Sequence, residues 1–91
     1  MEFMNRDTRL KRLYFRSWHR GTREADMMIG GFFDVHGARW SDAEIDWYEN
    51  FLEEQDVDIM AWAIGTQEVP AKWAGPMIDA FCKLDYLTTF G

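Results

Sequence analysis

The chain has 91 residues, of which 47% are hydrophobic and 16% aromatic, and its formal net charge is −6. This predicts one domain with a single core, too small to enclose an interior active site or cofactor, which disfavours a free-standing enzyme. A single cysteine, Cys82, excludes an intramolecular disulfide and indicates a reducing compartment, and no apolar run approaches the ~18 residues of a membrane span.

The first predicted helix spans residues 7–18, because apolar and basic side chains segregate there at helical spacing. Its apolar side comprises Leu10, Leu13, Tyr14 and Trp18. Its other side carries Arg9, Arg12 and Arg16.

The second predicted helix begins just after Gly21. It ends at Gly37, since glycine readily takes the left-handed conformation that follows many helix C-termini. Its apolar stripe comprises Ala25, Met28, Ile29 and Phe32. Gly30 and Gly31 lie inside it, and each lowers helix stability by about 1 kcal/mol. A break, a kink or close packing is therefore expected at this point.

Local start and stop signals define three further helices. Ser41 followed by Glu44 forms a capping-box pattern, which predicts the start of the third helix. Asp56 is expected to cap the fourth helix, which runs to about Ile64 and ends at Gly65. Pro76 opens the fifth. The predicted core residues of the third and fifth helices are Ile45, Tyr48, Phe51, Leu52, Ile78, Phe81, Cys82 and Leu84.

These elements predict an all-α protein, a compact bundle of five short helices formed by one domain over residues 1–91. Strand signals are nearly absent, because no alternating apolar run exceeds a few residues and no hairpin turn signature occurs. Residues 1–6 and 88–91 are expected to be a flexible N-terminus and a flexible tail.

The charges are distributed unevenly along the chain. Residues 1–23 hold seven basic and two acidic side chains, a net charge of +5, whereas residues 24–91 hold three basic and fourteen acidic side chains, a net charge of −11. This pattern predicts either a basic arm that faces an anionic partner or two halves that neutralise each other across the fold.

Signals for metal or nucleophilic chemistry are weak. His19, His36 and Cys82 are scattered, without the spacing of a metal site. Cys82 lies in an apolar helix stripe, where cysteine behaves as an inert core residue. The carboxylates Glu53, Glu54, Asp56 and Asp58 form an acidic cluster, which is interpreted as a solvated turn or as a patch for a basic partner.

Residues 16–24, Arg-Ser-Trp-His-Arg-Gly-Thr-Arg-Glu, form the most informative segment. Gly21 suits a tight corner between two helices. Glu24 can cap the next helix or meet the positive end of its dipole. The density of arginine beside an exposed turn, with Trp18 adjacent, is not required by structure and is typical of a protein-binding hot spot.

Arg20-Gly21-Thr22-Arg23-Glu24 also matches the Arg-Gly-x-x-Glu signature of the succinate dehydrogenase flavinylation factor family, which the chain resembles. Other segments follow the family's order and spacing. They are residues 16–24, Phe32-Phe33, residues 41–44 (SDAE), and residues 52–59 (LEEQDVDI) with Trp62. The resemblance covers about residues 7–65. Gly30-Gly31 departs from it where many members continue the helix.

The resemblance implies a five-helix assembly factor that binds the flavoprotein subunit of succinate dehydrogenase and, in bacteria, of its fumarate reductase relative. Such a protein promotes covalent attachment of FAD to a histidine of that partner and holds no FAD stably itself. The partner-binding residues carried over to this sequence are Arg16, Arg20, Gly21, Arg23, Glu24 and Asp58. Gly21 would allow close approach of the partner, and Glu24 would orient the arginines. Trp62 is expected in the core.

Two rival classes remain at this stage. A nucleic-acid-binding or regulatory module would use the basic first helix, although the acidity elsewhere disfavours binding to nucleic acid. A small enzyme or flavin carrier would retain FAD. The start of the sequence lacks the apolar core of a signal peptide. A monomer in the bacterial cytoplasm is expected, or in the mitochondrial matrix if the source is a eukaryote.

Overall fold

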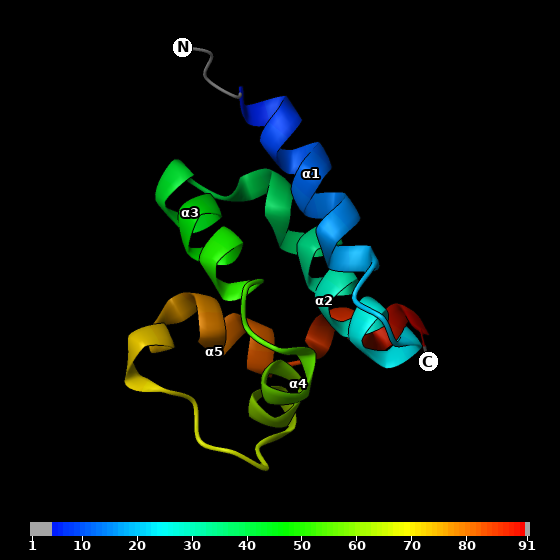
Figure 1. The fold of residues 1–91 in the computed structure, drawn as a ribbon, viewed down its shortest axis with the longest axis vertical. Coiled ribbons are helices and arrows are strands. Elements are labelled where there is room, and N and C mark those ends of the chain that lie inside the picture. Colours follow the sequence, from blue (N-terminus) through cyan, green and yellow to red (C-terminus); the bar gives the residue numbers. More distant parts are fainter. Residues whose placement is uncertain (1–4, 91) are drawn as a thin grey trace.

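A computed structural model describes residues 5–90, and within them all regular structure is helical. The helices are α1 (Arg6–Trp18), α2 (Arg23–His36), η1 (Gly37–Arg39), α3 (Asp42–Phe51), α4 (Asp56–Ile64), η2 (Ala71–Trp73), α5 (Pro76–Cys82) and η3 (Asp85–Phe90), where η denotes a 3₁₀ helix. The all-α prediction with five α-helices is confirmed. Figure 1 shows α1 beside α2, α3 to their left, and α4 and α5 below.

The helix α1 begins at Arg6, one residue before the predicted start, because the Asn5 side chain caps it by accepting a hydrogen bond from the Thr8 backbone N–H (2.8 Å). Leu13 is buried as predicted. Tyr14, predicted to face inward, is 52% exposed, so that prediction is wrong. Ser17 is buried instead, because its hydroxyl lies 2.6 Å from both the Leu13 carbonyl and the Tyr48 hydroxyl.

The helix α2 runs without interruption through Gly30 and Gly31. Close packing explains Gly30, because a Cβ there would lie 2.3 Å from the indole ring of Trp18. The prediction of a left-handed Gly37 is wrong. Its φ of −56° is right-handed, and the chain continues into η1. A Cβ at Gly37 would lie 2.8 Å from the Phe33 ring, so this glycine also provides space for a side chain.

The capping box of α3 is confirmed, with Ser41 and Glu44 each accepting a hydrogen bond from the other's backbone N–H. The helix α4 ends at a left-handed Gly65 as predicted, with φ +85°. Its N-cap, however, is Gln55 and not Asp56. Asp56 is the first helical residue, and its carboxylate accepts a hydrogen bond from Arg20 instead of capping the helix.

The core is built largely from aromatic side chains. Phe32 lies at its centre, with its ring centroid 5.2 to 6.2 Å from those of four other rings, Trp40, Tyr48, Phe81 and Tyr86. The predicted core residues of α3 and α5 are buried, except that Cys82 and Leu84 are only partly buried. Trp62 is buried as expected, and Trp73 and Tyr86 join the core without having been predicted.

The two ends of the chain are only partly described. Residues 1–4 and 91, which belong to the predicted flexible segments, lie outside the described residues, and the flexibility of both segments stays a prediction. The last described element, η3, packs back against α2. No helix in the described part combines the length and apolar character that crossing a bilayer requires.

Candidate functional site

The Arg-Gly-x-x-Glu segment forms the corner between α1 and α2. Thr22 starts α2 as its N-cap, since its hydroxyl accepts a hydrogen bond from the Ala25 backbone N–H (3.2 Å). Gly21 has φ +120°, a value that other residues rarely adopt. A Cβ at Gly21 would meet no atom within 4 Å. The backbone angle of the corner therefore requires glycine, and the space above Gly21 is open.

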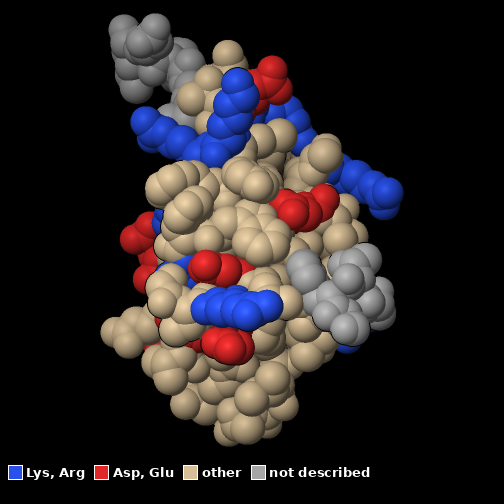
Figure 2. Space-filling view, turned by 90° about the vertical axis from the view of Figure 1, so that its right-hand side faces the viewer, with Lys and Arg blue, Asp and Glu red and all other residues tan. Residues whose placement is uncertain are grey.

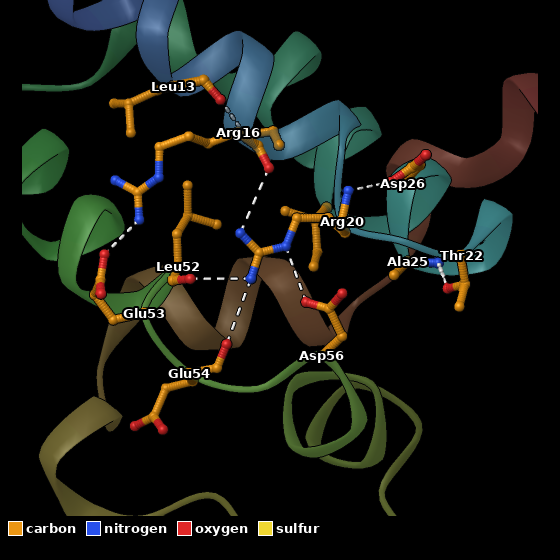
Figure 3. A network of polar contacts seen from close by, with 12 residues as sticks. Leu13, Arg16, Arg20, Thr22, Ala25, Asp26, Leu52, Glu53, Glu54 and Asp56 are labelled. Atoms are coloured by element: carbon orange, nitrogen blue, oxygen red, sulfur yellow. Dashed lines mark hydrogen bonds and ion pairs between the residues drawn. The ribbon is translucent and has the colours of Figure 1, made fainter.

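Arg20 points into the protein and not toward solvent, with 11% of its side chain exposed. Its Nε donates to an Asp56 carboxylate oxygen (2.9 Å), and one Nη donates to the Leu52 carbonyl (2.9 Å). Weaker contacts at 3.4 Å reach the carbonyls of Arg16 and Glu54. Figure 3 shows this guanidinium between the end of α1 and the loop that precedes α4. Arg20 thus ties the corner to the loop 52–56.

A second contact fixes the backbone of the corner. The Arg20 backbone N–H donates to the Asp26 carboxylate (2.6 Å), which joins the chain before Gly21 to the first turns of α2. Asp26 was not singled out from the sequence. Its position in the first turn of a helix could have indicated this role, because a carboxylate near a helix N-terminus is suited to accept hydrogen bonds from backbone N–H groups.

The remaining predicted site residues have different environments. Arg16 pairs with Glu53 (2.6 Å) at the surface. Arg23 and Glu24 are exposed in the first turn of α2, and neither makes a side-chain hydrogen bond or ion pair within residues 5–90. Glu24 was expected to orient the arginines, but its side chain makes no described contact with them. Glu53 and Asp56 hold Arg16 and Arg20 instead. Asp58 is half-buried on α4, and no described hydrogen bond or ion pair connects it to the corner.

Beside the corner lies an open pocket of about 780 Å³, here called the corner pocket. Its lining residues are Trp18, His19, Gly21, Thr22, Arg23, Asp26 and Met27. The pocket combines the rings of Trp18 and His19 with a thioether, one cation and one carboxylate. This mixture is suited to receiving side chains of another protein. His19 and Met27 were not predicted to belong to a site, since only the α1–α2 crossing brings them together.

Trp18 is held in the corner pocket by two features of α2. Its indole N–H donates to the Asp34 carboxylate (3.2 Å), and its ring lies against Gly30, which has no side chain to obstruct it. Gly30, the first of the two glycines inside α2, is therefore linked to the site. Gly30 positions one wall of the corner pocket.

Replacing Gly30 with alanine should lower the free energy of unfolding by about 1 to 2 kcal/mol. The gain in helix propensity of about 1 kcal/mol is smaller than the cost of displacing the Trp18 ring. Denaturant unfolding and tryptophan fluorescence would measure the stability and the ring's environment. Val35→Gly is a control, because Val35 is an exposed residue of the same helix (49%), where glycine lowers the helix propensity without opening the core. A stabilised Gly30→Ala protein with unchanged fluorescence would contradict this account.

The basic first segment is largely neutralised within the fold. Four of its arginines pair with acidic residues of α3, of the loop that follows it and of α4. These ion pairs are Arg6–Asp42 (3.6 Å), Arg9–Asp46 (2.6 Å), Arg9–Glu49 (2.9 Å), Arg16–Glu53 (2.6 Å) and Arg20–Asp56 (2.9 Å). The hydrogen bonds that the Arg9 guanidinium donates to Glu49 and Asp46 raise the pKa of Arg9. For these four arginines, the interpretation that the basic and acidic parts of the chain neutralise each other therefore holds. A nucleic-acid interface formed by the whole helix is disfavoured.

The acidic cluster before α4 is likewise engaged by internal partners. Glu54 accepts hydrogen bonds from Lys72 (3.1 Å) and from the Trp73 indole N–H (2.9 Å), and both lower the pKa of Glu54. Together with the Arg16–Glu53 and Arg20–Asp56 pairs, these contacts join the loop to α1 and to η2. Three of the four carboxylates thus have cationic partners within the fold.

No described feature points to metal or thiol chemistry. Among residues 5–90, no three histidine, cysteine or carboxylate side chains group as metal ligands. Cys82 donates to the Trp62 carbonyl (3.5 Å), and burial raises the pKa of its thiol, which disfavours the reactive thiolate. The exposed corner and its pocket are therefore the best candidate for a functional site.

The sequence of this chain is similar to those of known proteins. A family model described as "Flavinator of succinate dehydrogenase" matches residues 11–85, which include the whole corner. The FAD assembly factor SdhE of Acetobacter pasteurianus is 38% identical over 74 residues, which cover 81% of this chain and 68% of that protein. No solved structure matches the chain significantly.

Fungal relatives are similar over much of this chain but are longer proteins. The mitochondrial succinate dehydrogenase assembly factor 2 of Mycosarcoma maydis is 35% identical over 69 residues, 76% of this chain but 29% of the relative. The protein of that name from Meyerozyma guilliermondii is 35% identical over 71 residues, 75% of this chain and 53% of the relative. The similarity thus spans about a third to a half of these fungal proteins.

Proposed function

We propose, because this chain belongs to the succinate dehydrogenase flavinator family, that it is an assembly factor for the flavoprotein subunit of succinate dehydrogenase. It promotes the covalent attachment of FAD to that subunit. The observation that carries the proposal is the family match over residues 11–85, with the Arg-Gly-x-x-Glu segment at an exposed corner beside a pocket.

The geometry supports a division of roles within the corner. Arg20 and Asp26 fix its shape from inside, while Gly21, Arg23 and Glu24 face outward. Open space above Gly21 lets a partner backbone approach closely, and the Arg23 guanidinium is available for a carboxylate or carbonyl of the partner. Arg16 and Asp58 extend this surface in the proposal.

The chemical contribution of such a protein is positioning. Binding holds the immature subunit in a conformation in which its acceptor histidine meets the flavin ring, so that the bond forms without a catalytic group from the assembly factor. FAD ends on the partner, and this chain holds none stably. The proposal extends to the fumarate reductase relative in bacteria. It places a monomer in the bacterial cytoplasm, or in the mitochondrial matrix of a eukaryote.

The test mixes the apo flavoprotein subunit with FAD, with and without this protein, and reads flavin fluorescence of the denatured subunit on a gel. We expect covalent labelling to be at least tenfold faster with the protein present. A subunit whose acceptor histidine is replaced controls for FAD that is bound but not bonded. Equal labelling with and without the protein, using a folded and labelling-competent subunit, would refute the proposal.

A further inference from the structure

The outward side of α1 carries an exposed aromatic residue that no core contact requires. Phe15 is 60% exposed, and its ring stacks on the His19 ring with centroids 3.9 Å apart and planes 14° apart. The His19 Nδ1 atom lies 2.8 Å from the Phe15 carbonyl, which holds the imidazole in place. A large apolar ring is thus presented to solvent in a fixed orientation, and such rigid aromatic groups anchor protein interfaces.

The same side of the helix carries two neighbouring cations that no described carboxylate pairs. Lys11 lies one helical turn before Phe15, at i and i+4 spacing, with Arg12 adjacent. Both are exposed, and neither forms an ion pair with any described carboxylate, in contrast with Arg6, Arg9, Arg16 and Arg20. We call Lys11, Arg12, Phe15 and His19 the outer α1 face.

This face continues into the corner pocket, because His19 belongs to both. Figure 2, which looks at the right-hand side of Figure 1, shows basic side chains toward the end where α1 begins, basic and acidic side chains together across the middle, and few charges at the bottom. The two surfaces together run from Lys11 to Met27. A partner seated in the corner pocket would therefore extend along α1.

We propose that the outer α1 face is a second contact region for the flavoprotein subunit, and that it receives an acidic segment with an apolar side chain against Phe15. The inference rests on the proposed function and names the chemistry of the partner surface. A protein of net charge −6 repels acidic partners overall, so the free cations Lys11 and Arg12 make this face the favourable one for an acidic segment. Nucleic acid is disfavoured by the same net charge and by the pairing of the other arginines.

The charge contribution is tested with Lys11→Glu/Arg12→Glu. The matched control, Arg39→Glu/Lys83→Glu, makes the same change in net charge at exposed residues of η1 and at the end of α5. Binding to the apo flavoprotein subunit is measured by titration calorimetry at low and high salt. We expect the first variant to bind about tenfold more weakly than the control at low salt, with the difference shrinking as salt screens the charges.

The aromatic contribution is tested with Phe15→Ala against Ile64→Ala, which truncates a similarly exposed apolar side chain on α4 (62%). We expect about tenfold weaker binding for Phe15→Ala at both salt concentrations, because apolar contacts are not screened. Circular dichroism verifies that all variants remain folded. Variants of the outer α1 face that bind like their controls would overturn the inference.

The two proposals fail differently. If the wild-type protein binds and labels the flavoprotein and the outer-face variants do so equally well, the inference falls and the proposed function stands. If the wild-type protein does not bind the subunit, both fall. Retention of the wild-type protein on an oligonucleotide that Lys11→Glu/Arg12→Glu abolishes, with flavoprotein binding unchanged, would overturn the inference in favour of a nucleic-acid surface.

Discussion

Replacing Arg20 with alanine is expected to lower the free energy of unfolding by about 3 kcal/mol, more than any single surface change in this chain. The guanidinium is almost fully enclosed and donates to the Asp56 carboxylate and to the Leu52 carbonyl. Its removal leaves these acceptors without their partner in a poorly solvated site. Denaturant unfolding followed by far-UV circular dichroism would measure the loss.

The control for this change is Arg16→Ala, four residues earlier on the same helix. Arg16 forms one ion pair, with Glu53, in which the arginine is half-buried and the glutamate is largely open to solvent. Its loss should lower the stability by less than about 1 kcal/mol. Arg20→Lys keeps the charge but lacks the planar fork that serves two acceptors, so it should fall between the two. Equal losses for Arg20→Ala and Arg16→Ala would show that the network around Arg20 does not support the fold.

The Arg20 network changes how the Arg-Gly-x-x-Glu segment is understood. From the sequence, its arginines and glutamate were expected to face the partner together. In the structure, the first arginine points inward and joins the corner to the loop before α4, whereas Arg23 and Glu24 point outward. Loss of partner binding in an Arg20 variant would therefore be an indirect effect of a misshapen corner, and the stability measurement distinguishes it from a lost contact.

Local signals predicted the helices to within a residue or two. The Ser41–Glu44 capping box, Gly65 and Pro76 act on the backbone nearest to them, so the printed sequence contains the whole cause. One error arose because a distant residue decided the outcome. Asp56 does not cap α4, because Arg20, 36 positions earlier, takes its carboxylate.

For the site as well, the features fixed by neighbouring residues could be predicted, and those that depend on distant residues could not. The exposed corner was predictable because Gly21 and the charged residues around it are adjacent in sequence. The corner pocket was not, since Trp18 and Met27 meet only where α1 crosses α2. The role of Gly30 was also hidden, because the Trp18 ring that needs its space lies twelve positions earlier on another helix. Likewise, the pairing of the N-terminal arginines with carboxylates between Asp42 and Asp56 could be stated only as one of two alternatives.

The largest functional effect is expected from Gly21→Leu, which should reduce flavinylation of the partner subunit at least tenfold while the protein stays folded. The new side chain would project into the open space above the corner, where the proposed partner approaches. The positive φ of +120° adds a strain of about 1 to 3 kcal/mol. The labelling assay and unfolding curves would be recorded on the same preparations.

Gly65→Leu separates the strain from the steric block. Gly65 also has a positive φ, +85°, and a Cβ there would likewise meet no atom within 4 Å, but this residue ends α4 and does not line the corner pocket. Both variants should lose similar stability, and only Gly21→Leu should lose flavinylation. Should the leucine unfold the corner, Gly21→Ala retains most of the strain with a smaller obstruction and should give an intermediate rate. Full activity of a folded Gly21→Leu protein would mean that the partner does not approach the backbone at this corner, because a leucine there occupies the space that close approach requires.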